Sequence, residues 1–209
     1  MRTRISCLAA GLVLLSWLVA GFLNADARGG QTAAPARGGA PSQIFGLKSP
    51  AFADGATLPA KYTCAAGRAA VSPPLQWVNP PSPREMATFA LILHDMEPRP
   101  QKGVDDVLHW MVWNIPAVSN GFPEGISATT PDLPDGSMQT NGNPGQAGIV
   151  GYRAPCLPQN AALSHHYAFE VFALDRRVDL PEKATRSDLL KAMDGHVLAH
   201  ASLIALSNR

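Results

Sequence analysis

The sequence lacks the motifs that mark several common enzyme classes. It contains no Gly-x-Ser-x-Gly elbow, no phosphate-binding P-loop and no His-Glu-x-x-His motif. Its formal net charge is only +1, and it has no run of Lys or Arg. We therefore expect neither a nucleic-acid partner nor attachment to an anionic membrane surface. A serine or nucleotide hydrolase has no support in the sequence, and we expect no cofactor and no bound metal.

The first 27 residues are predicted to be a secretory signal peptide. Arg2 and Arg4 precede an apolar run at residues 5–23, and Ala25-Asp26-Ala27 has the small-x-small pattern that signal peptidase accepts. The run is close to the length that spans a bilayer, so an uncleaved anchor stays open as the alternative. With the signal removed, we expect a periplasmic or secreted protein without membrane insertion.

Residues 28–43 are predicted to be a flexible linker, because they carry no large apolar side chain. Such a segment cannot bury enough surface to offset the entropy lost on ordering. The folded domain is expected to span residues 44–207.

This domain is predicted to be mainly β with few short helices. Two apolar runs, 87–94 and 108–115, indicate strands buried on both faces. Residues 167–174 alternate, which is typical of a further strand. Shorter strands are expected at 44–47, 73–77 and 201–207. The one clear helix is expected to start at a cap, Thr185 or Ser187, and to end near Gly195. Residues 117–165 are predicted to form long loops, and loops of this length inside a domain are usually functional.

Cysteine is scarce, and only Cys64 and Cys156 remain once the signal is removed. Export would place them where disulfides persist, so they either form a bridge or stay as two buried thiols. A bridge would close a long loop and stabilise the fold by roughly 4 kcal/mol.

Acidic and histidine side chains lie at the ends of the predicted strands. Asp95 and Glu97 follow the strand at 87–94, while His109 and His165 open later strands. Taken singly, they fit an acidic turn and structural histidines. If the strands are neighbours, however, the four residues would line one small polar site. The two carboxylates would repel one another there, which would raise the pKa of one of them.

Such a site suits three kinds of chemistry, which the spacing does not separate. It would bind a divalent metal, act as general acid and base, or bind a phosphate-like anion through protonated histidines and backbone N–H groups. A second pair, His196 and His200, would share one face of a helix. Gly195 interrupts any helix there, so ordinary structural histidines are expected at this pair.

Several short motifs occur in a fixed order along the chain. They are Ala51-Phe52-Ala53-Asp54-Gly55, Tyr62-Thr63-Cys64, Ser72-Pro73-Pro74-Leu75-Gln76-Trp77, His109-Trp110, Asn114-Ile115-Pro116, the run from Gly151-Tyr152 to Pro158, His165-His166-Tyr167, Phe172-Ala173-Leu174-Asp175 and Gly195-His196-Val197-Leu198-Ala199. In this order they resemble the phosphatidylethanolamine-binding protein family, most closely its bacterial Raf-kinase-inhibitor-like branch. The resemblance implies a large antiparallel sheet flanked by a smaller sheet and short helices. It also implies a small pocket for phosphate-type anions.

The resemblance further implies which residues line that pocket. The family's acidic segment falls on residues 95–99, its pocket histidines on His109 and His165, and its pocket tyrosine on Tyr152. The predicted ligand-binding residues are therefore Asp95, Glu97, His109, Tyr152 and His165.

The chain departs from the family pattern after Tyr152. Arg153 and Leu157 stand where the family usually has Gly and Pro, and they either narrow the pocket or add a cationic donor. We expect an exported, non-enzymatic binding protein for a small anion. The alternatives are a protein-interaction module, such as a protease inhibitor or a regulator of a partner, and a metal-dependent hydrolase.

Overall fold

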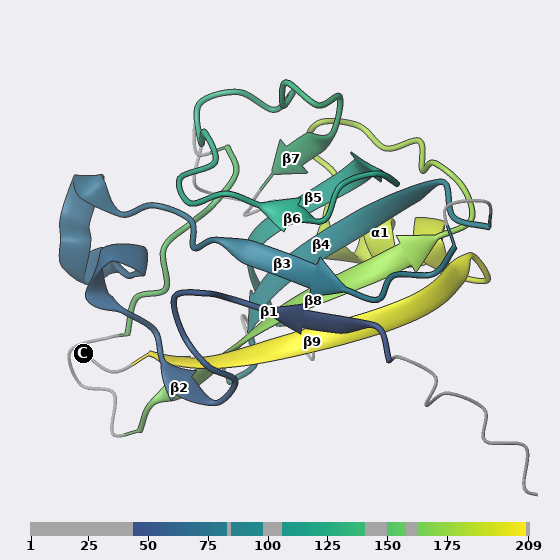
Figure 1. The fold of residues 1–209 in the computed structure, drawn as a ribbon. Helices are drawn as coiled ribbons and strands as arrows, with labels where there is room; N and C mark the ends of the chain where they lie inside the picture. Colours follow the sequence, from purple (N-terminus) through teal and green to yellow (C-terminus); the bar gives the residue numbers. More distant parts are fainter. Residues whose placement is uncertain (1–43, 83–84, 98–105, 141–149, 158–162, 208–209) are drawn as a thin grey trace, which may run out of the picture. The chain divides into compact units, whose positions relative to one another are not determined.

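Two β-sheets pack face to face in the computed structural model of the protein (Figure 1). The structure describes residues 44–82, 85–97, 106–140, 150–157 and 163–207. All of them belong to one compact unit, residues 41–209. The signal peptide and the linker lie outside the described residues, so they stay predictions, as do the limits of the domain.

The larger sheet has six strands in the order β2-β9-β8-β4-β5-β7. Every neighbouring pair is antiparallel except β2 and β9, which run parallel. All residues of the central strand β4 are buried, as an apolar run covered on both faces should be. The strands are β2 (Ala56–Thr57), β4 (Thr88–Asp95), β5 (Val107–Pro116), β7 (Met138–Thr140), β8 (His165–Leu174) and β9 (Val197–Ser207).

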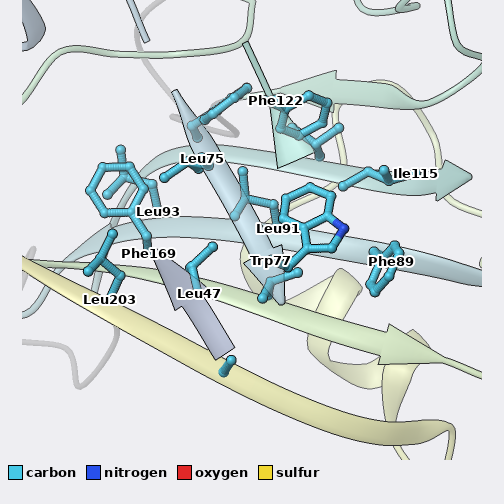
Figure 2. Close-up of a cluster of buried hydrophobic side chains, with 14 of the residues drawn as sticks. Leu47, Leu75, Trp77, Phe89, Leu91, Leu93, Ile115, Phe122, Phe169 and Leu203 are labelled. Atoms are coloured by element: carbon cyan, nitrogen blue, oxygen red, sulfur yellow. The ribbon is translucent and has the colours of Figure 1, made fainter. Parts of the chain in front are cut away.

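The smaller sheet covers one face of the larger one and consists of β1 (Gly46–Lys48), β3 (Leu75–Val78) and β6 (Gly121–Phe122). Figure 2 shows Trp77 of β3 between Phe89 of β4 and Phe122 of β6. The ring centroids lie 5.3 Å and 5.7 Å from that of Trp77. Burying one such large apolar side chain contributes about 1.5–3 kcal/mol, so this contact holds the two sheets together.

The opposite face of the larger sheet is covered by helix α1 (Arg186–Met193), which lies behind the sheet in Figure 1. Thr185 caps the helix in a capping box with Asp188, and the chain turns at Gly195, where φ is +76°. Leu189 and Met193 are buried on this face. Two short 3-10 helices, η1 (Ala60–Tyr62) and η2 (Cys64–Ala69), lie between β2 and β3. None of the helices in the described part of the chain combines the length and the hydrophobicity that a membrane span requires.

The predicted fold class, mainly β with a large sheet flanked by a smaller one, is confirmed. The strands expected at 87–94 and 108–115 match β4 and β5 to within one residue at each end. The expectation of loops throughout 117–165 was wrong, because β6 and β7 lie inside that range. These strands have two and three residues, too few for the alternation of side chains to become visible.

The last strand also starts earlier than the sequence suggested. β9 begins at Val197 instead of residue 201, and its first four side chains are exposed or only partly buried, so no apolar pattern marks them. His200 therefore lies on a strand, where its Nε2 is 3.2 Å from Glu170, while Nδ1 of His196 is 2.9 Å from Asp175. Each of these histidines therefore lies beside a carboxylate.

Candidate functional site

Five polar side chains gather where β4 ends, and we call them the sheet-end cluster: Asp95, His109, Arg153, His165 and Tyr167. Because β4 lies between β5 and β8, its last residue is brought close to residues of both neighbours. Tyr167 of β8 is the direct cross-strand partner of Asp95. The ring centroid of Tyr167 lies 5.2 Å from that of His109 and 6.4 Å from that of His165. Tyr167 is thus the contact that links the two histidines.

Asp95 orients His165. Its Oδ2 lies 2.8 Å from Nδ1 of His165, and its Oδ1 accepts a hydrogen bond from the backbone N–H of Glu97 at 3.1 Å. A carboxylate can only accept, so Nδ1 of His165 carries the proton in this contact. The Asp95 side chain is almost completely buried, whereas that of His165 keeps 19% of its surface exposed. This histidine can therefore meet a ligand from outside.

His109 is held as a neutral imidazole. Its Nδ1 lies 2.9 Å from the carbonyl oxygen of Arg153, and its Nε2 lies 3.3 Å from the guanidinium of the same residue. The carbonyl can only accept and the guanidinium can only donate, so the proton is on Nδ1 and the lone pair is on Nε2. Burial and the positive charge of Arg153 lower the pKa of His109 to about 4. A protonated His109, as the anion-binding hypothesis assumed, is not supported.

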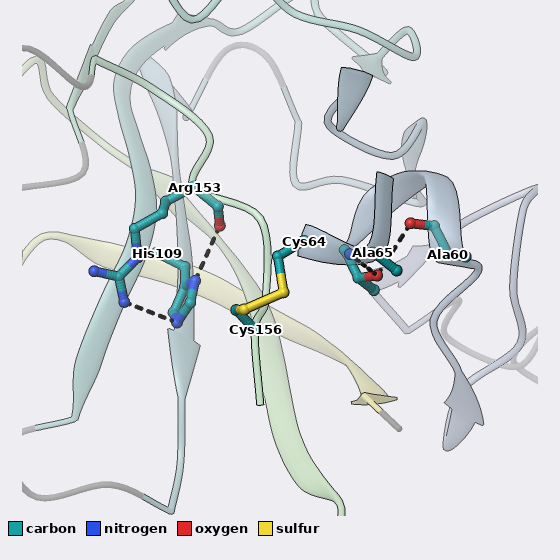
Figure 3. Close-up of a disulfide and its surroundings, with 7 residues drawn as sticks. Ala60, Cys64, Ala65, His109, Arg153 and Cys156 are labelled. Atoms are coloured by element: carbon teal, nitrogen blue, oxygen red, sulfur yellow. Dashed lines mark hydrogen bonds between the residues drawn. A yellow bond between two sulfur atoms is a disulfide. The ribbon is translucent and has the colours of Figure 1, made fainter. Parts of the chain in front are cut away.

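Arg153 supplies the positive charge that His109 does not. Its segment is fixed to the fold at several points: its backbone N–H donates to the carbonyl of His109 at 2.9 Å, and Cys156 is joined to Cys64 by a disulfide (Figure 3). The two cysteines thus pair rather than stay as free thiols. Gly151 opens the segment with φ of +75°, and a Cβ there would come within 2.5 Å of the Gln139 side chain. Only glycine fits this close approach.

The hydroxyl of Tyr167 is buried without a hydrogen-bond partner among the described residues. The Asp95 carboxylate and the Cys156 backbone are near enough to affect the pKa of this hydroxyl, but neither forms a hydrogen bond of good geometry with it. Burial and the negative charge of Asp95 raise the pKa of Tyr167, so the hydroxyl keeps its proton. An unpaired hydroxyl in this position is costly unless something else pairs with it.

Glu97 lies beside the cluster but is bonded elsewhere. One oxygen accepts from the backbone N–H of His166 at 2.6 Å, and the other lies 2.6 Å from Nδ1 of the same residue. Burial acts to raise the pKa of Glu97, but these two bonds outweigh it and the pKa is lowered. The expected rise in the pKa of one carboxylate is therefore not found at Glu97.

Potential metal-ligating atoms of Asp95, Glu97 and His165 do lie within 4.8 Å of one another. Because Asp95 already bonds to His165 and Glu97 to His166, a cation would compete with these pairs for the carboxylate oxygens.

Tyr152, also predicted to bind the ligand, lies in the hydrophobic core. Its hydroxyl donates to the backbone carbonyl of Tyr62 at 2.5 Å, and its ring meets Trp110 edge-on at 5.8 Å. Burial raises the pKa of Tyr152, so this donor stays protonated. The geometry gives Tyr152 a packing contact and leaves its predicted ligand role without support.

A second polar group lies on the opposite face of the larger sheet, and we call it the charge network: His94, Asp106, Glu170, Arg186 and His200. The ring nitrogens of His94 lie 2.7 Å from Asp106 and 3.0 Å from Glu170, although neither contact has good hydrogen-bond geometry. Arg186 lies 3.7 Å and 4.0 Å from the same two carboxylates. Burial acts to raise the pKa of Glu170, but the contact with His94, together with His200 and Arg186 nearby, outweighs burial and lowers this pKa. This network joins α1 to the sheet.

The family model described as phosphatidylethanolamine-binding protein matches residues 48–208. The chain belongs to this family. A UPF0098 protein of Methanothermobacter thermautotrophicus is 40% identical over 166 residues, which cover 78% of this chain and 98% of that protein. A UPF0098 protein of Chlamydia trachomatis is 34% identical over 159 residues, covering 76% and 95%.

Solved structures of family members have the same fold. A protein of Chlamydia trachomatis described as a phosphatidylethanolamine-binding protein homologue superposes with a TM-score of 0.65 at 32% identity, covering 79% of this chain and 98% of that one. The E. coli protein YbcL, described as a member of the mammalian family, gives a TM-score of 0.63 at 22% identity, covering 80% and 99%. The second likeness shows the fold alone. Family and fold, which the sequence motifs predicted, are both confirmed.

The sequence reasoning did not single out Tyr167 as a site residue, and it named Arg153 only as a departure from the family pattern. Tyr167 is two positions after His165, so on a strand both side chains point to the same face. That spacing was a usable signal. The contact between Arg153 and His109 joins residues 44 positions apart and has no sequence signal.

Proposed function

We propose that this protein is an exported, non-enzymatic binding protein whose sheet-end cluster binds a small anion of the phosphate type. The observation that carries the proposal is the buried hydroxyl of Tyr167, which has no hydrogen-bond partner among the described residues. Leaving a buried hydroxyl unpaired costs about 1–3 kcal/mol. An oxygen of a bound anion would remove this cost.

The donors of the cluster favour an anion over a cation. Arg153 contributes a guanidinium, which cannot accept a hydrogen bond, and Tyr167 contributes a protonated hydroxyl. The carboxylate of Asp95 is already bonded to His165 and to a backbone N–H. Of the five side chains, Arg153 and His165 keep the most exposed surface, so a ligand would approach over them.

The same geometry supports binding without catalysis. His109 stays neutral near pH 7, and its lone pair already accepts from Arg153, which makes it a poor general base. Cys156 beside the cluster is held in a disulfide and has no thiolate to act as a nucleophile.

Export to the periplasm or to the outside of the cell is part of the proposal. It is supported by the predicted signal peptide at residues 1–27, after whose removal no membrane insertion is expected. The Cys64–Cys156 disulfide supports it as well, because disulfides persist mainly in oxidising compartments.

The test is calorimetric titration of the purified protein with inorganic phosphate. We expect binding by the wild type and a clear loss of affinity in His165→Ala, which removes the ring that Asp95 orients. His196→Ala is the matched control, because this histidine also pairs with an aspartate but lies next to Val197, at the other end of β9 from the cluster.

Absence of phosphate binding in the wild type, or equal loss in both variants, would refute the proposal. Co-purification of a protein partner whose binding survives both substitutions would instead favour the protein-interaction module, such as a protease inhibitor or a regulator of that partner.

A further inference from the structure

Arg153 is the one member of the sheet-end cluster with a fixed positive charge. Its side chain is half-buried, and burial lowers its pKa, but an arginine in a protein stays charged. No carboxylate among the described residues forms an ion pair with it. The carboxylate of Asp95 attracts the guanidinium from a distance, while bonding to His165.

The contact that holds the guanidinium is weak. The distance from its terminal nitrogen to Nε2 of His109 is 3.3 Å, and the acceptor is a neutral imidazole. Contacts between arginine and phosphate are shorter, charge-assisted and frequently bidentate, and they are roughly twice as strong as neutral hydrogen bonds. Exchanging His109 for a phosphate oxygen is therefore favourable for Arg153.

Backbone bonds keep Arg153 in place during such an exchange. Its N–H donates to the carbonyl of His109, and its own carbonyl accepts from Nδ1 of that residue, both at 2.9 Å. Only the side chain has to move. The hydroxyl of Tyr167, which lies within electrostatic reach of Arg153, remains as a second donor.

We propose that Arg153 makes this site selective for dianionic phosphomonoesters over phosphodiester head groups. The inference rests on the anion-binding function proposed above. A phosphomonoester presents three terminal oxygens and a charge of about −1.5 to −2 at pH 7. Two oxygens match the guanidinium fork and the third matches the Tyr167 hydroxyl. A phosphodiester has a single charge and only two free oxygens, so once one of them pairs with the Tyr167 hydroxyl it cannot occupy both branches of the guanidinium fork.

Phosphomonoesters occur both as soluble compounds and as lipid head groups. The test therefore has two arms: glycerol 3-phosphate against glycerophosphoethanolamine in solution, and phosphatidylcholine vesicles containing either phosphatidic acid or phosphatidylethanolamine. The wild type should bind the monoester of each pair at least about tenfold more tightly than the diester. This ratio is expected when one charge-assisted hydrogen bond forms with the monoester but not with the diester. Binding to glycerol 3-phosphate alone would identify a soluble ligand, and added binding to the phosphatidic acid vesicles would identify a lipid.

Two variants isolate the guanidinium. Arg153→Gln removes the charge but keeps the backbone bonds to His109, and it should weaken monoester binding about ten- to a hundredfold, with a much smaller effect on the diester. Arg153→Lys, which keeps the charge without the fork, should restore part of the affinity. Equal thermal melting of the variants and the wild type checks that the fold is intact.

If Arg153→Gln leaves the ratio of monoester to diester affinity unchanged while His165→Ala abolishes binding, the site binds anions but Arg153 does not select them. A wild type that prefers the diester or the phosphatidylethanolamine vesicles also overturns the selectivity. If the wild type binds none of the probes, both proposals fall.

Discussion

Replacing Tyr167 by phenylalanine should stabilise the ligand-free protein and weaken its binding of phosphate. The substitution removes one oxygen and keeps the ring that packs between His109 and His165. In the ligand-free protein that oxygen is buried without a hydrogen-bond partner among the described residues. The two effects have opposite signs because the hydroxyl is costly until a ligand pairs with it.

The size of both effects follows from the cost of an unpaired buried hydroxyl. Its removal should raise the free energy of unfolding by about 1–2 kcal/mol, at the lower end of the desolvation penalty because the Asp95 carboxylate partly compensates. For a domain of this size the melting temperature should rise by about 2–8 °C. Affinity for phosphate should fall by about three- to tenfold, the value of one ordinary hydrogen bond.

The assay is urea and thermal unfolding of the ligand-free protein, followed by calorimetric titration with phosphate. Tyr152→Phe is the matched control, because its hydroxyl is also buried but donates to the carbonyl of Tyr62. This control should lose about 1 kcal/mol, since the carbonyl is left unpaired. If Tyr167→Phe is destabilised as much as Tyr152→Phe, the hydroxyl is satisfied without a ligand and the reasoning behind the proposed site is wrong.

Three further predictions concern stability. The pKa of His109 is about 4 in the folded protein and 6.5 in the unfolded chain. Between pH 6.5 and pH 4 the imidazole is therefore protonated only in the unfolded chain. As the pH falls through this window, the free energy of unfolding should drop by up to about 3 kcal/mol. In His109→Gln this part of the slope should vanish, and an unchanged slope in urea titrations at several pH values would argue against a neutral His109. His94→Ala should lower the free energy of unfolding, measured in urea, by about 2–4 kcal/mol, because the carboxylates of Asp106 and Glu170 lose the ring between them. His196→Ala removes an exposed pair with Asp175 and should cost less than about 1 kcal/mol. Similar losses in the two variants would show that the charge network contributes little. Non-reducing mass mapping should find a peptide that joins Cys64 and Cys156, and two free thiols would contradict the pairing. Because the bridge spans 92 residues, its reduction should lower the free energy of unfolding by about 4–5 kcal/mol.

The sequence predicts the centre of this fold better than its edges. The apolar runs that became β4 and β5 are continuous because both faces of the larger sheet are covered, one by the smaller sheet and one by α1. The exposed beginning of β9 and the short strands β6 and β7 have no such pattern. Their pairing depends on neighbours that only the folded chain brings close.

The candidate site divides in a similar way. Asp95, His109 and His165 were identified because strand ends and family motifs point to them, and the structure brings them together. The role of Arg153 could not be predicted, because a segment far along the chain has to pass beside β5 before the guanidinium meets His109. The family pattern also drew attention to Tyr152, whereas the tyrosine with an unpaired hydroxyl is Tyr167.

The end of β4 has a consequence for any attempt to re-engineer this protein. His94 and Asp95 are consecutive, and successive side chains of a strand point to opposite faces, so one joins the charge network while the other enters the sheet-end cluster. Inserting or deleting a single residue in β4 would exchange them. A third carboxylate would then face Asp106 and Glu170, and His165 would lose the group that orients it. Loop grafts should therefore leave β4 and the residues up to Glu97 intact, because β4 ends at Asp95 and Glu97 still bonds to His166.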